Sequence, residues 1–296
     1  MSELLSVSTT GLSLGCTYAL VAMGIVILYK GSSVLNFSHG SIAVFGAYVT
    51  ARLTEPLGFW MAALLGIVAA AGVSLLIERL LVNRMRNAGP ISMAILTIGI
   101  EIVLRTELAR RIGIDILPLG QPWGTRSVVV GGAIIPWNRI ITIAVTVLIV
   151  AVFLLVFRYS RWGISMRAAA EDRETAEIVG VKLGSTAMIT WLAAGALAAV
   201  AGILLTGAPS SGLSPVLSTV VLRALAAAII GGLDSITGAL VGGAVVGCVE
   251  AVSVTYQNEL SFLGLGVSDV GAFGVMFLVL LVRPQGLFGS KELVRV

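Results

Sequence analysis

Side chains able to take part in chemistry are gathered in a few short stretches of this sequence. The densest runs from Arg158 to Lys182, RYSRWGISMRAAAEDRETAEIVGVK, and holds five basic and four acidic residues in 25 positions. The alanine and glutamate content of residues 168–179 favours a helix. So many charges in an otherwise apolar chain predict contact with water or with a polar partner.

Charge spacing within this stretch predicts an amphipathic helix. Arg167 with Glu171, and Arg173 with Glu177, are placed for i, i+4 surface ion pairs. Two glycines, at positions 180 and 184, supply a stop signal. From the residues alone two interpretations stand: a solvated connector between two spans, or a docking element that fits a groove on a soluble subunit.

A second polar stretch interrupts an apolar region at Asn36-Phe37-Ser38-His39-Gly40. Polar side chains inside a membrane are costly unless they are partnered or wetted. Asn36, Ser38, His39 and Gly40 therefore have two interpretations. They line a translocation pathway, or Asn36 and His39 fix packing through hydrogen bonds to neighbouring helices.

A third polar break, Gly231-Gly232-Leu233-Asp234-Ser235, precedes another small-residue stretch. Asp234 and Ser235 lie either at a cytoplasmic gate or in a tight turn that faces water. Four further charges, Glu101, Arg105, Arg223 and Glu250, fall in or near apolar stretches, where interior pairing is expected. Arg223 and Glu250 are the candidate pair, because they lie on neighbouring predicted spans.

Several chemistries find no support in the sequence. It contains no G-x-x-x-x-G-K-[ST] loop, so it lacks the usual cradle for ATP phosphates. One histidine and two separated cysteines, Cys16 and Cys248, predict neither a metal cluster nor a disulfide. We therefore predict a chain that is not an enzyme and binds no cofactor of its own.

The elements that hold these stretches are apolar helices. Hydrophobic residues make up 57% of the 296 positions and charged residues 11%, against roughly 25% charged in soluble domains. Only 6% are aromatic, which disfavours a barrel with aromatic girdles. The 35 glycines favour close helix packing. We predict an all-α, polytopic transmembrane bundle.

Nine apolar segments have membrane-spanning length or close to it. They are residues 11–29, 34–52, 58–82, 90–108, 139–158, 186–207, 216–232, 236–254 and 267–283. Residues 34–52 and 90–108 carry internal polar groups, so these two segments are predicted to be short, broken or re-entrant. The expected total is eight or nine membrane segments in one permease-like domain covering residues 1–296.

Basic residues predict the orientation of the bundle. The first turn, the loop at about residues 159–185 and the C-terminus are therefore expected in the cytoplasm. With three spans before the first turn, the N-terminus is expected outside. The residues are Arg79, Arg84 and Arg86 in the first turn, Arg158 to Lys182 in the loop, and Arg283, Lys291 and Arg295 at the C-terminus. This basic pattern explains the net charge of +4 better than nucleic-acid binding does.

Residues 109–138 must then be extracytoplasmic, although they and their flank carry Arg110, Arg111, Arg126 and Arg139. Their prolines and glycines predict an irregular loop with a short hairpin around residues 127–135. A plain connecting loop and a docking surface for an external partner both fit.

Four stretches together resemble the LivH-type permeases of branched-chain amino acid ABC importers. These are GLSLGCTYALVAMGIVILYKGSSVLNFSHGSIAVFGAY at 11–48, RYSRWGISMRAAAEDRETAEIVGV at 158–181, GGLDSITGALVGG at 231–243 and LLVRPQGLFG at 280–289. The resemblance spans nearly the whole chain, with the motifs in the family's order. It is less specific for the substrate than for the family.

This resemblance implies a transporter with two permease subunits, two cytoplasmic ATPases that bind ATP and Mg²⁺, and an external solute-binding protein in the bacterial inner membrane. The partner permease would be a different, LivM-like chain. Residues 166–180 match the family's coupling helix, which implies that its residues contact the ATPase: Arg167, Ala168, Ala170, Glu171, Asp172, Glu174 and Gly180.

Two departures from related patterns stand out. Residues 168–172 read Ala-Ala-Ala-Glu-Asp and differ from the Glu-Ala-Ala loop of other importers, so no individual contact is assigned. Asp234 stands where the family commonly has glycine. Branched-chain amino acids are the leading substrate class, followed by urea, short amides and other small carboxylates. A self-sufficient secondary transporter or small-solute channel, or a membrane scaffold, is the alternative.

Overall fold

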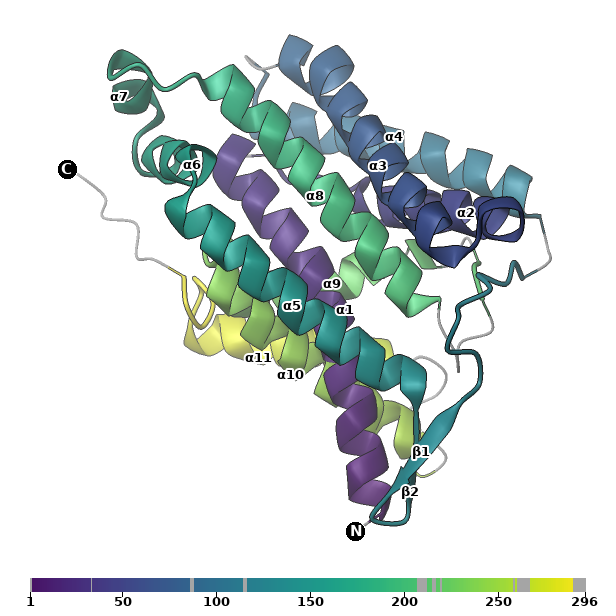
Figure 1. The fold of residues 1–296 in the computed structure, drawn as a ribbon. Coiled ribbons are helices and arrows are strands. Elements are labelled where there is room, and N and C mark those ends of the chain that lie inside the picture. The colour runs from purple at the N-terminus through teal and green to yellow at the C-terminus, as the bar shows by residue number, and fades with distance from the viewer. Residues whose placement is uncertain are drawn as a thin grey trace.

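The computed structural model describes residues 2–32, 34–85, 88–113, 116–206, 212–214, 217–218, 220–257, 259 and 267–289. Within these residues the chain is a helical bundle with one small hairpin (Figure 1). The first helices are α1 (Ser2–Ser32), α2 (His39–Leu57), α3 (Phe59–Ile77) and α4 (Pro90–Ile112). A π-helical turn (Glu78–Val82) and a 3₁₀ turn (Asn83–Met85) extend α3.

After the hairpin strands β1 (Ser127–Val130) and β2 (Ala133–Pro136) comes α5 (Trp137–Tyr159). Two short helices, α6 (Arg161–Glu171) and α7 (Arg173–Ile178), lead to α8 (Leu183–Leu205). The chain then forms α9 (Val220–Gly231), α10 (Ile236–Thr255) and α11 (Val267–Val282). All nine predicted apolar segments therefore correspond to helices.

Within the part of the chain that the structure describes, five helical stretches are long and apolar enough to cross a membrane. They are Ser2–Ser32, Phe59–Met85, Trp137–Tyr159, Leu183–Leu205 and Ile236–Thr255. The largest difference from the sequence-based boundaries is in α1, which begins nine residues before the predicted range, whereas α2 begins at His39, five residues after the start of its predicted range. Residues 34–38 before it are not helical.

Helices α1 and α10 form the tightest seam of the bundle. Gly11 and Gly15 on α1 face Gly243 and Gly247 on α10, four residues apart on both helices. A Cβ added to Gly243 would lie 2.6 Å from the backbone nitrogen of Ala19. Small residues let two backbones approach this closely, and dispersion contacts then hold them together.

A second group of small residues packs α8 against α2 and α3. A Cβ on Gly195 would lie 2.5 Å from the Cβ of Ser74, and one on Gly202 would overlap the carbonyl of Ala43. In contrast, few residues of α5 are buried, with Asn138, Thr142, Thr146 and Phe153 as its buried positions. The core therefore lies among α1, α2, α3, α8, α9 and α10, and α5 covers α1 from one side (Figure 1).

The predicted irregular loop is confirmed as a connection with a short hairpin. It is shorter than predicted, because α4 continues to Ile112 and α5 begins at Trp137. Strands β1 and β2 pair antiparallel, with Ser127 opposite Pro136 and Val130 opposite Ala133. The hairpin packs beside the first turns of α1, where the Leu5 side chain would lie 3.1 Å from a Cβ on Gly131. It thus lies at the N-terminal end of the bundle (Figure 1).

The basic turns gather at the opposite end. The end of α1, the π-helical turn after α3 and the segment between α7 and α8 line one cavity there. The Lys30 ammonium donates to the Asp234 carbonyl at 2.8 Å, and Leu287 and Phe288 donate to the carbonyls of Ile230 and Gly231. Among the basic residues used for the prediction, Arg86, Lys291 and Arg295 lie outside the described residues.

Candidate functional site

The charged stretch forms two helices where sequence predicted one. Helix α6 begins at Arg161, seven residues before the predicted start, and the chain breaks at Asp172 before α7. Asp172 Oδ1 accepts hydrogen bonds from the backbone nitrogens of Glu174 and Thr175, both at 3.0 Å. Asp172 is therefore the N-cap of α7, which explains the break physically.

Helix α6 is anchored in the bundle by its apolar side. Met166 is fully buried, and the Trp162 indole donates to the hydroxyl of Thr190 on α8 at 3.2 Å. The Trp162 ring also makes edge contacts with Phe153 and Phe157 of α5. Because α6 contacts both α5 and α8, a displacement of α6 would also displace these two helices.

The predicted surface ion pairs are absent from this segment. Arg167 instead donates to the carbonyls of Phe157 and Arg158, at 2.5 and 3.2 Å, and lies over the Phe157 ring. Arg173 and Glu177 form no ion pair with each other or with another described residue. The arginine at position 167 satisfies orphan carbonyls at the end of α5, which the pair spacing did not reveal.

The coupling segment, defined here as residues 161–182, presents a largely exposed outer surface. The predicted contact residues Arg167, Ala168, Ala170, Glu171, Asp172, Glu174 and Gly180 are all exposed. Sequence reasoning missed Ile178 and Val179, whose side chains are 81% and 78% exposed. Gly180 follows with φ +95°, which ends the helix as predicted, whereas Gly184 lies inside α8. An exposed apolar pair, Ile178 and Val179, therefore lies at the end of α7.

The second polar stretch re-enters the bundle. His39 lies against Gly24 of α1 so closely that a Cβ at position 24 would overlap the imidazole ring. Gly24 is eight residues, or about 12 Å, before the end of α1. Non-helical backbone at membrane depth is tolerated where protein covers it. Residues 34–38 thus connect α1 to α2 and return the chain into the interior of the bundle.

Buried polar groups in this stretch are incompletely partnered. Asn36 Oδ1 accepts from the backbone nitrogen and hydroxyl of Ser38, at 3.0 and 2.7 Å. Neither Asn36 Nδ2 nor either ring nitrogen of His39 has a hydrogen-bond partner among the described residues. His39 is fully buried. An unsatisfied buried polar group is costly, so this cluster is suited to water or to a passing polar solute.

Helix α4 holds residues 35–41 in place through two hydrogen bonds. The Thr97 hydroxyl donates to the Leu35 carbonyl at 3.1 Å, and Glu101 Oε2 accepts from the backbone nitrogen of Ser41 at 3.3 Å. Glu101 thus places a carboxylate at the N-terminal turn of α2, where the helix dipole favours negative charge. This contact gives the intramembrane charge of α4 a partner that the sequence could not identify.

Asp234 and Ser235 lie in the turn between α9 and α10. The Ser235 hydroxyl accepts from the backbone nitrogen of Gly238 at 3.0 Å and is the N-cap of α10. Gly232, at φ +104°, lies directly before the turn and packs against Gly289. Lys30, which donates to the Asp234 carbonyl, lies on α1 after Gly24, so the turn is roughly 9 Å further along α1 than His39, toward the coupling segment's end.

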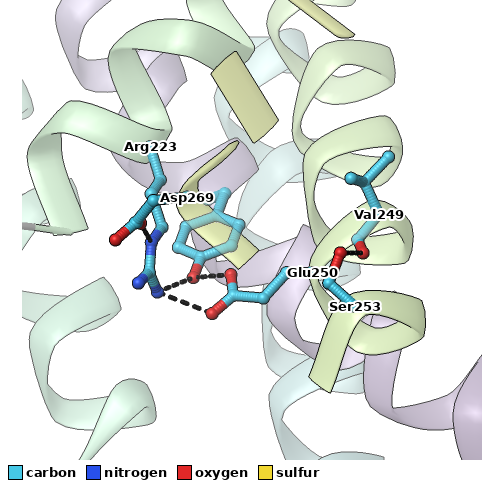
Figure 2. Close-up of polar contacts among 6 residues, drawn as sticks. Arg223, Val249, Glu250, Ser253 and Asp269 are labelled. Carbon is cyan, nitrogen blue, oxygen red and sulfur yellow. Dashed lines mark hydrogen bonds and ion pairs between the residues drawn. The ribbon is translucent and has the colours of Figure 1, made fainter. Parts of the chain in front are cut away.

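The candidate pair of intramembrane charges is confirmed and belongs to a larger network. Arg223 Nη1 lies 2.6 Å from Glu250 Oε1, and Arg223 Nε lies 2.7 Å from Asp269 Oδ1 (Figure 2). The Tyr18 hydroxyl donates to the second oxygen of Glu250. The network joins α1, α9, α10 and α11. Sequence reasoning missed Tyr18 and Asp269, because their proximity depends on how four helices pack.

Two kinds of comparison place this chain among known proteins. The family model described as "Branched-chain amino acid transport system / permease component" matches residues 8–282. The high-affinity branched-chain amino acid transport system permease protein LivH of Salmonella typhimurium is 32% identical, over 97% of this chain and 96% of its own length. The permease protein BraD of Pseudomonas aeruginosa is 30% identical with the same coverage.

A solved structure shares the fold. One chain of PsaBC from Streptococcus pneumoniae, determined in complex with Fab, superimposes with a TM-score of 0.54 over 96% of this chain and 93% of its own length. The two sequences are 13% identical, so the match concerns the fold alone.

Proposed function

This chain belongs to the family of permease components of branched-chain amino acid transport systems, and we propose that it forms half of the translocation pathway of an ATP-driven importer. The chain is a multi-pass membrane protein, and we place it in the bacterial inner membrane. Its cargo is a branched-chain amino acid or a similar small polar solute. ATP and Mg²⁺ bind to partner ATPase subunits, and this chain contributes no cofactor.

The observation that carries this function is the geometry of the coupling segment. Trp162 and Met166 anchor α6 between α5 and α8, and the opposite side offers the exposed tip of Ile178 and Val179. Such a segment can fit a cleft of an ATPase and pass its closure into the helices. The expected partners are two ATPases, a LivM-like second permease and an external solute-binding protein.

The arrangement of the basic turns supports the orientation. They lie at the coupling segment's end, which we place in the cytoplasm, and the hairpin lies at the opposite end beside the start of α1. Eight or nine membrane segments are then expected. Five described helical stretches are both long and apolar enough by themselves, whereas α2 and α4 have the length but are more polar, and α9 and α11 are shorter. We propose that these four helices complete the count as short, tilted or re-entrant segments.

Asn36, Ser38, His39 and Gly40 are proposed to lie along the pathway, with Asp234 and Ser235 at its cytoplasmic end. Support comes from the unpartnered nitrogens of Asn36 and His39 at membrane depth. We expect His39→Ala, compared at matched membrane abundance, to reduce uptake several-fold, because it removes polar groups from the re-entrant stretch. Unchanged uptake would assign His39 to packing alone.

The central test targets the apolar tip. In the complete importer, the double substitution Ile178→Ser and Val179→Ser should lower uptake about tenfold and weaken copurification of the ATPase, because apolar anchors are lost from the docking surface. The matched control is Val129→Ser with Val130→Ser in the exposed hairpin at the other end, which should leave copurification of the ATPase unchanged.

A secondary transporter or channel predicts a different pattern. Uptake would then continue when the copurifying ATPase carries an inactivating substitution, and the tip variant would transport normally. A scaffold predicts assembly without any transport by the wild-type complex. Either outcome would overturn the proposed function.

A further inference from the structure

Helix α4 carries a glutamate and an arginine one helical turn apart. Glu101 lies midway between Pro90 and Ile112, the two ends of α4, about 16 Å from each. Arg105 follows one turn later, toward the end that leads to the hairpin. The side chain of Glu101 is too short to reach either membrane surface. Its carboxylate therefore stays at membrane depth, where a charge is costly unless it meets water or an opposite charge.

These two charges do not neutralise each other. A glutamate four residues before an arginine is well spaced for an ion pair. The same helix forms such pairs near its end, where Glu107 lies 2.8 Å from Arg110 and 2.5 Å from Arg111. Arg105, in contrast, forms no ion pair or hydrogen bond with Glu101 or with any other described residue. The interior pairing predicted for these charges is therefore not made between them.

The Glu101 carboxylate is held from its buried side only. Its Oε2 accepts from the backbone nitrogen of Ser41, whereas Oε1 accepts no hydrogen bond from the residues that the structure describes. The side chains of Ser41 and Ser218 lie near the same carboxylate, although neither hydroxyl completes a hydrogen bond with a described residue. Both serines are buried, whereas Glu101 is half-buried. The carboxylate is thus fixed in position and still accessible from outside the bundle.

Four side chains form an accessible stripe on this side of the helix, which we call the α4 face. They are Ile98, Glu101, Ile102 and Arg105, and their spacing of three and four residues puts them on one side of a helix. Ile98 and Ile102 are 42% and 52% exposed, and Arg105 is exposed. Lipid hydrocarbon offers no partner to either charge. A surface with an anion, a cation and two aliphatic side chains instead complements a zwitterion with an aliphatic side chain.

We propose that the α4 face borders the translocation pathway and recognises the passing amino acid. Glu101 receives its ammonium group, Arg105 receives its carboxylate, and Ile98 and Ile102 contact its aliphatic side chain. Positions one helical turn apart have Cβ atoms about 5–6 Å from each other, so one small zwitterion can meet both charges. The inference rests on the proposed function, which supplies the pathway and the class of cargo.

Selectivity follows from the two charges. A solute that lacks the ammonium group leaves Glu101 without a partner at membrane depth, and one that lacks the carboxylate does the same to Arg105. A site built to pair with a polar group rejects analogues without that group, because its own polar groups then remain unpaired. The α4 face therefore selects zwitterions over simple amines and simple acids.

The first test measures leucine uptake per complex by the complete importer in proteoliposomes, with the solute-binding protein outside and ATP inside. Glu101→Gln keeps an oxygen that can accept from the Ser41 nitrogen but removes the negative charge. Uptake should fall at least tenfold, while the unfolding temperature stays that of the wild type. Arg105→Gln should cause a similar loss, and Arg105→Lys should retain part of the uptake. Glu107→Gln, at the exposed end of α4, is the matched control and should transport like the wild type.

The second test assigns each end of the ligand. Titration calorimetry on the purified importer in nanodiscs, without the solute-binding protein, compares leucine with isoamylamine, which lacks the carboxylate, and with 4-methyl-2-oxopentanoate, which lacks the ammonium group. Both analogues should bind the wild type at least tenfold more weakly than leucine. Glu101→Gln should weaken isoamylamine further and leave 4-methyl-2-oxopentanoate unchanged, and Arg105→Gln should do the reverse.

Several outcomes would overturn the inference. Wild-type uptake by Glu101→Gln would leave Glu101 as a contact that holds α2, and reduced uptake with a lower unfolding temperature would assign it to packing. Loss of the second permease on purification of both variants would assign the α4 face to contact between permeases. Equal affinity of the wild type for all three compounds, or no binding of leucine, would also contradict recognition at this face. Failure of the proposed function is distinguishable, because wild-type uptake would then be absent or independent of the ATPase.

Discussion

The α1–α10 seam and the coupling segment are built by opposite rules. In the seam, glycines 11, 15, 243 and 247 bring two backbones together, and even a methyl group has no space. In the coupling segment most side chains face outward, and Met166 and Ala176 are among its few buried residues. In the seam, side-chain size is therefore restricted to glycine. In the coupling segment, the chemistry of the exposed side chains matters more than their size.

The charged network extends this contrast. Arg223, Glu250 and Asp269 hold helices together, as the seam does. Through these residues and Tyr18, helices α9, α10 and α11 are joined to α1. The side chain of Glu250 is 10% exposed and that of Arg223 is 25% exposed. Charges in the coupling segment, by contrast, lie in the open. Charge thus holds helices together in the bundle and faces outward in the coupling segment.

The largest effect is expected from Arg223→Leu. It leaves Glu250 buried with Tyr18 alone, and removing one member of a buried pair costs roughly 2 to 4 kcal/mol after allowance for partial exposure. Thermal unfolding of the purified complex in detergent should occur at a clearly lower temperature, with reduced membrane abundance.

The control for that substitution is Arg110→Leu, which breaks an exposed pair with Glu107 and should leave the unfolding temperature unchanged. Adding Glu250→Leu to Arg223→Leu should recover part of the lost stability, because the uncompensated carboxylate is gone. Equal unfolding temperatures for wild type and Arg223→Leu would show that the network does not support the bundle.

A smaller loss is expected from Gly243→Ala in the seam. The new Cβ would lie 2.6 Å from the Ala19 nitrogen, so α1 and α10 must separate, at a cost of about 1 to 3 kcal/mol. Gly72→Ala is the matched control, because a Cβ there on α3 meets nothing within 4 Å. The comparison is made by unfolding temperature. Equal stability of the two variants would contradict a size-constrained seam.

The smallest stability effect is expected in the coupling segment. Asp172→Ala removes the N-cap of α7, worth about 1 kcal/mol to that short helix. Because α7 stands outside the core, the unfolding temperature of the complex should not move, whereas uptake should fall a few-fold. Asp172→Asn keeps a capping oxygen and should retain most transport. If Asp172→Ala lowered the unfolding temperature but left uptake unchanged, the coupling segment would support stability rather than transport.

Local chemistry explains which predictions succeeded. Runs of apolar residues fixed the nine helices, because their length and hydrophobicity depend on no distant partner. A helix was predicted over residues 168–179, where the structure has the end of α6 and all of α7. The break was missed, since a single aspartate at position 172 competes with helix propensity by capping the next turn. The expected partner of Arg167 was wrong, because carbonyls at the end of α5 are closer acceptors.

By itself, the sequence determined a membrane-embedded helical chain with a charged segment at one end, because composition and periodicity are properties of neighbouring residues. Only the tertiary structure decided that His39 lies beside Gly24, that Glu101 meets the start of α2, and that the buried Trp191 indole nitrogen has no partner among the described residues. Each of these depends on the packing of helices distant in sequence, and small shifts in that packing determine whether a buried polar group finds a partner.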